Sequence, residues 1–255
     1  LQHTSHTIKA QKFSLLIFFV IVISQLSFAQ PNKKIDSLLN ILKTAAEDTN
    51  KVNTLAELCA QLFQKDKYAE AKKYAEDALL LAEKTGFKKG IANAHKNIGV
   101  IYDRLGNYSD ALKNYFASIK IMKEIGDNKG LGTGYNNIGF FYDNQGNSAE
   151  ALKYFFNALK IFEGLNYKAG IGKSYVGITS VYIEKGNYPE ALKNGLKALK
   201  TTEEAADKTG IADSHTQIGL IYYYLSNNAE MLKHIMAALK IYEEIGEKSG
   251  VTTSL

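Results

Sequence analysis

The chain has 255 residues, of which 45% are hydrophobic, and a formal net charge of +5. Two of its 31 basic residues, Lys9 and Lys12, lie in a segment that we expect to be removed, which leaves 29 basic against 26 acidic residues, or +3. This excess is too small and too dispersed for a nucleic-acid-binding protein. Because Cys59 is the only cysteine, an intramolecular disulfide is excluded, and we expect Cys59 to be a small core residue.

Residues 1–29 have the pattern of a secretory signal peptide. Lys9 and Lys12 precede an apolar run over 13–23, and Ser27-Phe28-Ala29 has small residues where signal peptidase cleaves. The run is shorter than the ~20 residues of a membrane-spanning helix. We therefore expect cleavage after Ala29 and export to the periplasm or another extracytoplasmic space, rather than an uncleaved anchor.

Residues 30–49 are predicted to be a lead-in followed by a capping helix. Ile35, Leu38, Leu39 and Leu42 form one apolar stripe at helical spacing. A helix here would cover the exposed end of a stack of repeats.

A 40-residue period organises residues 50–249. Its clearest copies begin at Gly90, Gly130, Gly170 and Gly210. A fixed period of this length indicates a stacked repeat architecture. We divide the segment into five repeats, 50–89, 90–129, 130–169, 170–209 and 210–249. Residues 250–255 match the start of a sixth repeat that stops at once, so we expect the chain to be a fragment.

Each repeat holds two helical patterns. In residues 90–129, Gly106-Asn107 separates them, and Gly126 is placed to end the second helix, as are Gly86 and Gly246 in other repeats. The small residue Gly99 is expected to let the two helices approach closely. Gly195 stands where an aromatic residue is expected, which predicts looser packing there.

An ordered set of residues resembles the tetratricopeptide repeat family in its long, 40-residue form. A small residue, an aromatic, an alanine and a second aromatic recur in order at Gly99, Tyr102, Ala111 and Tyr115, and again at Gly139, Tyr142, Ala151 and Phe155. The resemblance implies an all-α fold, a right-handed α-solenoid of tetratricopeptide helix pairs that binds a protein or peptide on the inner side of its superhelix. It signals the fold strongly and the function weakly.

No catalytic, metal-binding or cofactor-binding constellation is predicted, so we expect a chain that is not an enzyme. His95 and His215 are 120 residues apart, in a slot that Tyr135 and Tyr175 fill in the intervening repeats, which favours packing over metal binding. Asp103 and Asp143 are expected to be solvated surface residues rather than an acid–base pair. The glycines of 130–134 lack the ending of a phosphate-binding loop.

The outward positions of the first helices form the predicted binding surface, which we call the first-helix surface. Amides that bond to a peptide backbone in either direction mix there with apolar side chains, which suits an extended peptide or a partner helix. An ordinary polar surface explains the same residues equally well. The two-carboxylate clamp of some family members is not expected, because Val100, Phe140, Ser180 and Leu220 hold its asparagine positions. The members of the first-helix surface are Asn93, Lys96, Asn97, Asp103, Arg104, Asn136, Asn137, Phe140, Asp143, Asn144, Lys173, Gln217, Leu220, Tyr223 and Tyr224.

Two functions from different classes follow. The first is an exported, non-catalytic scaffold that binds a protein or peptide. The second is the sensory region of a membrane signalling enzyme, because a signal sequence before long-form repeats resembles the N-terminal regions of bacterial sensor histidine kinases and adenylate cyclases. In that case a membrane contact would come only from a segment beyond residue 255.

Overall fold

The computed structural model describes residues 33–246, which divide into two units at residue 45. The predicted signal peptide, its cleavage site and the start of a sixth repeat lie outside the described residues. In the first unit, α2 (Lys33–Thr44) is a helix, as its apolar stripe predicted, and Ile35 is buried. Its capping role stays a prediction.

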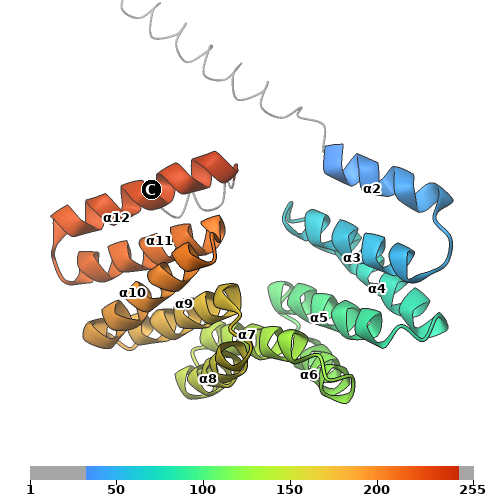
Figure 1. Ribbon diagram of the computed structural model, residues 1–255, viewed down its shortest axis with the longest axis horizontal. Helices are drawn as coiled ribbons and strands as arrows, with labels where there is room; N and C mark the ends of the chain where they lie inside the picture. The colour runs from blue at the N-terminus through green and yellow to red at the C-terminus, as the bar shows by residue number, and fades with distance from the viewer. Residues whose placement is uncertain (1–32, 247–255) are drawn as a thin grey trace, which may run out of the picture. The chain divides into compact units, whose positions relative to one another are not determined.

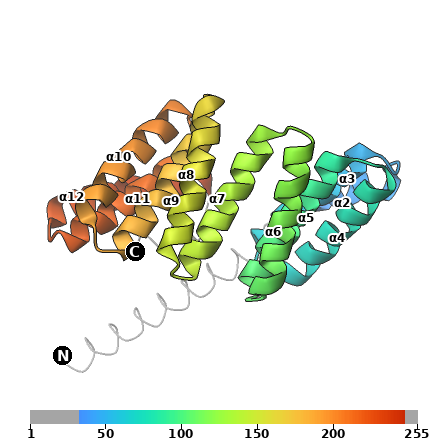
Figure 2. The same cartoon turned by 90° about the horizontal axis from the view of Figure 1, so that it is seen from below.

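The second unit consists of consecutive helices joined by short turns (Figures 1 and 2). They are α3 (Thr49–Phe63), α4 (Tyr68–Lys84), α5 (Lys88–Arg104), α6 (Tyr108–Glu124), α7 (Asn128–Asn144), α8 (Ser148–Gly164), α9 (Lys168–Glu184), α10 (Tyr188–Glu204), α11 (Lys208–Tyr224) and α12 (Asn228–Ile245). No strand occurs between residues 33 and 246. The predicted all-α solenoid of helix pairs is confirmed. None of the described helices has the length and hydropathy needed to cross a membrane.

One left-handed residue ends every helix from α3 to α12. These residues recur every 20 positions, with φ between 48° and 75°, at Asp66, Gly86, Gly106, Gly126, Gly146, Asn166, Gly186, Ala206, Ser226 and Gly246. The helix ends are closed by backbone bonds such as the one from Asn107 N to Tyr102 O, at 2.9 Å. The predicted C-caps Gly86, Gly126 and Gly246 are therefore confirmed.

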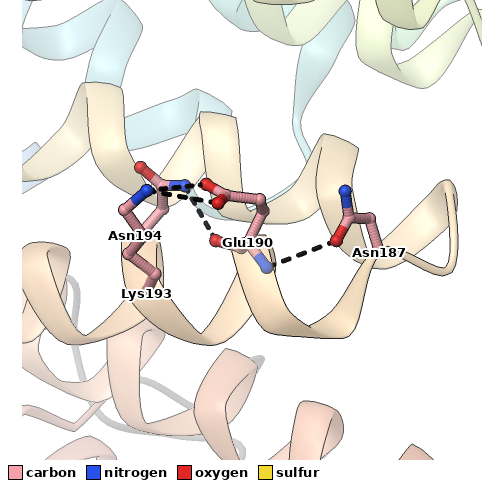
Figure 3. A network of polar contacts seen from close by, with 4 residues as sticks. All are labelled: Asn187, Glu190, Lys193 and Asn194. Carbon is pink, nitrogen blue, oxygen red and sulfur yellow. Dashed lines mark hydrogen bonds and ion pairs between the residues drawn. The ribbon is translucent and has the colours of Figure 1, made fainter.

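An asparagine caps the start of four second helices. The side chains of Asn107, Asn147, Asn187 and Asn227 each accept a hydrogen bond from the backbone N–H three residues later. At α10, the Glu190 carboxylate accepts from Lys193 Nζ at 3.2 Å and its backbone carbonyl accepts from Asn194 Nδ2 at 2.8 Å (Figure 3). The cap and the first turn are thus held by side chains of the helix itself.

A glycine on the first helix faces a large side chain on the second helix of the same repeat. A Cβ added to Gly99 would lie 2.8 Å from the Tyr115 ring, and one added to Gly139 would lie 2.6 Å from the Phe155 ring. Real Cβ atoms essentially never approach this closely, so a larger residue would force the facing ring or the helices themselves to shift. The predicted close approach of the two helices is confirmed.

The repeat of α9 and α10 reverses this arrangement. Thr179 occupies the first-helix position that is Gly139 and Gly219 in the adjacent repeats. Gly195 occupies the second-helix position that is Phe155 and Ile235 there. Thr179 and Gly195 are buried, and a Cβ added to Gly195 would lie 3.5 Å from Thr179 Cγ2 and 3.2 Å from Ile218. The expectation of looser packing is wrong, because the larger side chain has moved from the second helix to the first.

The first helices also pack against one another across repeats. α3 contacts α5, α5 contacts α7, α7 contacts α9 and α9 contacts α11, whereas successive second helices of the second unit are not in contact. The first helices therefore form the inner layer of the stack. Neighbouring repeats share a core, in which Tyr115 of α6 meets Phe141 of α7 with ring centroids 6.2 Å apart.

We predict that Ala206→Gly stabilises the protein. Ala206 has a φ of 51° and an exposed side chain. A left-handed conformation costs an L-residue about 1–2 kcal/mol, and the extra entropy of an unfolded glycine offsets about half of that gain. Urea unfolding should show a gain of up to about 1 kcal/mol. Ala205→Gly, one residue earlier in right-handed geometry, should instead lose stability, and equal effects of the two changes would contradict the assignment.

Candidate functional site

The first-helix surface comes from α5, α7, α9 and α11, and the structure divides it by exposure. Arg104, Asn144, Lys173, Leu220, Tyr223 and Tyr224 are exposed. Asn93, Lys96, Asn97, Asp103, Asn137, Phe140 and Gln217 are partly buried. Asn136 and Asp143 are buried, with exposed fractions of 1% and 5%. The prediction that these last two point outward is wrong, and so is the prediction that Asp143 is solvated.

Two amide side chains of this surface, the buried Asn136 and the partly buried Gln217, join neighbouring first helices. Asn136 Oδ1 of α7 accepts a hydrogen bond of 3.0 Å from Ser174 Oγ of α9. One step along the stack, Gln217 Nε2 of α11 donates to the backbone carbonyl of Val176 in α9, at 3.1 Å. Both side chains thus make an inter-repeat bond where a ligand contact was predicted, although Gln217 Oε1 is buried without a hydrogen-bond partner among residues 33–246.

Asp143 is a buried carboxylate with an incomplete set of partners. Burial raises its pKa to about 6, the neighbouring charge of Glu184 acts in the same direction, and a hydrogen bond with Ser180 opposes them. Its Oδ1 atom has no hydrogen-bond partner among residues 33–246. The arrangement favours the protonated carboxyl group.

Two lysines converge on the inner layer although 77 residues separate them. Burial lowers the pKa of Lys96 on α5, and the positive charge of Lys173 on α9 lowers it further. Within the described residues, neither ammonium group has an ion pair with a carboxylate at 4.0 Å or less, although the charge of Lys173 acts on Asp213 of α11 from further away. Lys173 Nζ lies 5.8 Å from the centre of the Phe140 ring. We call Lys96, Phe140 and Lys173 the lysine site.

All three residues belong to the predicted first-helix surface, but their proximity to one another was not predicted. The available signal was their position in the repeat, because Lys173 lies two periods minus three residues after Lys96. A shift of three residues keeps a side chain on the same face of a helix. The lysine site is thus visible in the sequence once the helices are superimposed by the 40-residue period.

The aromatic end of the predicted surface has a different role. Tyr224 stacks on Tyr188 of α10, with ring centroids 5.1 Å apart and planes 13° apart. Its exposed neighbour Tyr223 packs edge-on against Tyr224. Tyr224 therefore joins the first and second helices of adjacent repeats.

Cys59 is buried, as predicted for a small core residue. Burial raises the pKa of its thiol to about 11, and the charge of Lys96 opposes this effect only in part. A thiol with this pKa is almost entirely protonated at neutral pH and is a poor nucleophile.

Residues 51–124 and 131–204 match the family model described as tetratricopeptide repeat. The two matches cover more than half of the chain. The chain belongs to the tetratricopeptide repeat family. A comparison with curated proteins gives no match.

Solved structures of tetratricopeptide-like proteins share the fold at low sequence identity. The Rap conjugation gene regulator of plasmid pLS20, in complex with the Phr* peptide, has a TM-score of 0.70 and 18% identity over 92% of this chain and 71% of its own. NprR in complex with its cognate peptide NprX has a TM-score of 0.68 and 16% identity over 92% and 67%. BtubC (BKLC) from P. vanneervenii has a TM-score of 0.65 and 17% identity over 84% and 91%. The predicted resemblance to sensory regions of signalling enzymes stays a prediction.

We predict that Asp143 makes stability depend on pH. Its pKa is higher in the folded than in the unfolded chain, so the folded state binds more protons between about pH 4 and pH 6, and stability falls as the pH rises through this window. Asp143→Asn removes the ionisation and should be more stable than the parent at pH 7, by up to about 3 kcal/mol. Urea unfolding should show this difference shrinking as the pH falls from 6 to 4, and a difference that is constant with pH would contradict the assignment.

Proposed function

We propose that this tetratricopeptide chain is a non-catalytic scaffold that binds an extended peptide or partner helix along its inner layer, with an acidic group of the ligand at the lysine site. The observation that carries the proposal is a pair of neighbouring ammonium groups that no carboxylate of residues 33–246 reaches within ion-pair distance, since Asp213 acts on Lys173 only from further away. Lys96 is partly buried, so water screens its repulsion from the exposed Lys173 ammonium only incompletely. A carboxylate between Lys96 and Lys173 would remove this repulsion and form charge-assisted hydrogen bonds.

The surroundings of the lysine site suit a peptide better than a free ion. Phe140 offers an apolar surface beside Lys173. Asn97 and Asn137, on α5 and α7, are partly buried and present amides that donate to and accept from a peptide backbone. The Rap regulator and NprR have similar folds, and their structures are complexes with peptides, which supports this class of ligand.

The first test uses a library of peptides that contain Asp or Glu and end in a free carboxylate, with matched amidated Asn and Gln peptides as the comparison. The full chain should select acidic peptides, and salt should weaken their binding. Lys96→Gln and Lys173→Gln should each reduce affinity about 10- to 100-fold, the loss expected for a hydrogen bond between charged groups. Melting temperatures should show that both variants remain folded.

Lys113 and Lys153 provide the matched control because both are exposed on second helices. Their replacement by Gln should leave peptide affinity unchanged. A preference for neutral peptides, or a loss of binding only in the Lys113 and Lys153 variants, would contradict the proposed site.

We also propose that the protein is exported. The support is the order of basic, apolar and small residues over 1–29. A reporter fused after residue 40 should leave the cytoplasm and begin after Ala29, as measured by N-terminal sequencing. A full-length reporter retained in the membrane would show that the segment is an anchor.

A further inference from the structure

Asp143 and Glu184 bring two acidic side chains together on the inner layer. Asp143 of α7 is 5% exposed, and its Oδ1 atom has no hydrogen-bond partner among residues 33–246. Burial, and then the negative charge of the exposed Glu184 on α9, raise the pKa of Asp143 to about 6. A carboxyl group with this pKa is still mostly ionised at pH 7. We call these two residues the carboxylate pair.

No positive charge of the described residues pairs with either carboxylate. Between residues 33 and 246, neither side chain has a Lys, Arg or His nitrogen within ion-pair distance. Arg104 stands two repeats before Glu184 at the same repeat position, but its charge acts on Asp103 of α5. The carboxylate pair is therefore an acidic counterpart of the lysine site, with like charges that only a cation from outside this part of the chain would neutralise.

The carboxylate pair and the lysine site share two helices. On α9, Lys173 and Glu184 are 11 residues apart, which is close to three turns, so both side chains lie on one face of the helix. On α7, Asp143 follows Phe140 of the lysine site by three residues and shares its face in the same way. At a rise of about 1.5 Å per residue, the Cα atoms of Lys173 and Glu184 are about 16 Å apart.

The ends of both helices add to the negative charge of the pair. Glu184 is the last residue of α9, and Asp143 is the last but one of α7. The C-terminal end of a helix carries a partial negative charge and favours a cation within its last turn. The charges of the two side chains and of the two helix ends therefore have the same sign.

We propose that the carboxylate pair is a second subsite for the ligand of the inner layer and binds an arginine or lysine side chain of that ligand. This inference rests on the proposed function, because the acidic group of the same ligand occupies the lysine site. The exposed Glu184 would contact the basic group directly, and the buried charge of Asp143 would strengthen the attraction in a medium that screens poorly.

The distance between the two subsites defines the ligand further. An extended chain advances about 3.3–3.6 Å per residue, so about 16 Å corresponds to about five residues. The ligand class is therefore an extended peptide with an acidic and a basic residue about five positions apart.

The first experiment measures the binding of three short peptides to the full chain at pH 7. Each peptide is acetylated, consists otherwise of alanine, and ends in aspartate with a free carboxylate. The first carries arginine about five positions before the aspartate, the second carries neutral citrulline there, and the third carries arginine directly beside the aspartate. Isothermal titration should show the first peptide binding about 10-fold tighter than the second, as expected for a hydrogen bond between charged groups, and tighter than the third. Equal affinities of the first and second peptides, or of the first and third, would overturn the inference.

Variants of the carboxylate pair test the same preference from the protein side. Glu184→Gln should bring the ratio of arginine to citrulline affinity to about one. Asp143→Asn should lower this ratio while it raises stability, a combination that a damaged fold cannot produce. Glu163→Gln is the matched control, because Glu163 is an exposed carboxylate in the last turn of the second helix α8, and it should leave the ratio unchanged. A ratio that persists in Glu184→Gln would overturn the inference.

Lys96→Gln separates this inference from the proposed function. Weaker binding of all three peptides to this variant, together with equal binding of arginine and citrulline peptides to the parent, would leave the lysine site in place and remove only the second subsite. Peptide binding that does not depend on Lys96 would contradict the proposed function, and this inference with it.

Discussion

The close approach of two helices within each repeat is the contact on which the rest of the structure depends. At Gly99 and Gly139 there is no room for even one more carbon atom before the facing ring is reached. Left-handed turn residues every 20 positions and asparagine caps set where the helices begin and end. The helices therefore have nearly the same length, and each pair meets at this contact. The two helices of successive repeats pack in the same way, so that the first helices lie against one another. They form a continuous inner layer.

This packing determines what the inner layer can offer to a ligand. One side of each first helix is used against its own second helix, and polar residues such as Asn136 and Gln217 are used to join adjacent first helices. What remains includes the apolar ring of Phe140 and the ammonium groups of Lys96 and Lys173, which have no carboxylate within ion-pair distance in the described part of the chain. The proposed ligand site is therefore the part of the inner layer that the stack leaves unsatisfied.

The 40-residue period was sufficient to predict the helix pairs, the small residue at Gly99 and the family. It was not sufficient to predict burial at Asn136 and Asp143, because their surroundings come from the next first helix, whose distance depends on the packing between repeats. The left-handed turns were only partly visible, since Ala206 gives no local signal for such a conformation. Pairs such as Asp143 and Glu184 require two helices to be placed side by side before they can be recognised.

A double-mutant cycle at Thr179 and Gly195 tests the helix contact most directly. Thr179→Gly removes the large side chain of this repeat, and Gly195→Phe places a ring against Thr179, so each change alone should cost about 1–3 kcal/mol. The double variant recreates the arrangement of Gly139 and Phe155, and the two changes should offset one another by about 0.5–3 kcal/mol. Urea unfolding of the four proteins measures this coupling. Losses that simply add would contradict the claim that one large and one small residue at this crossing determine the approach of the two helices.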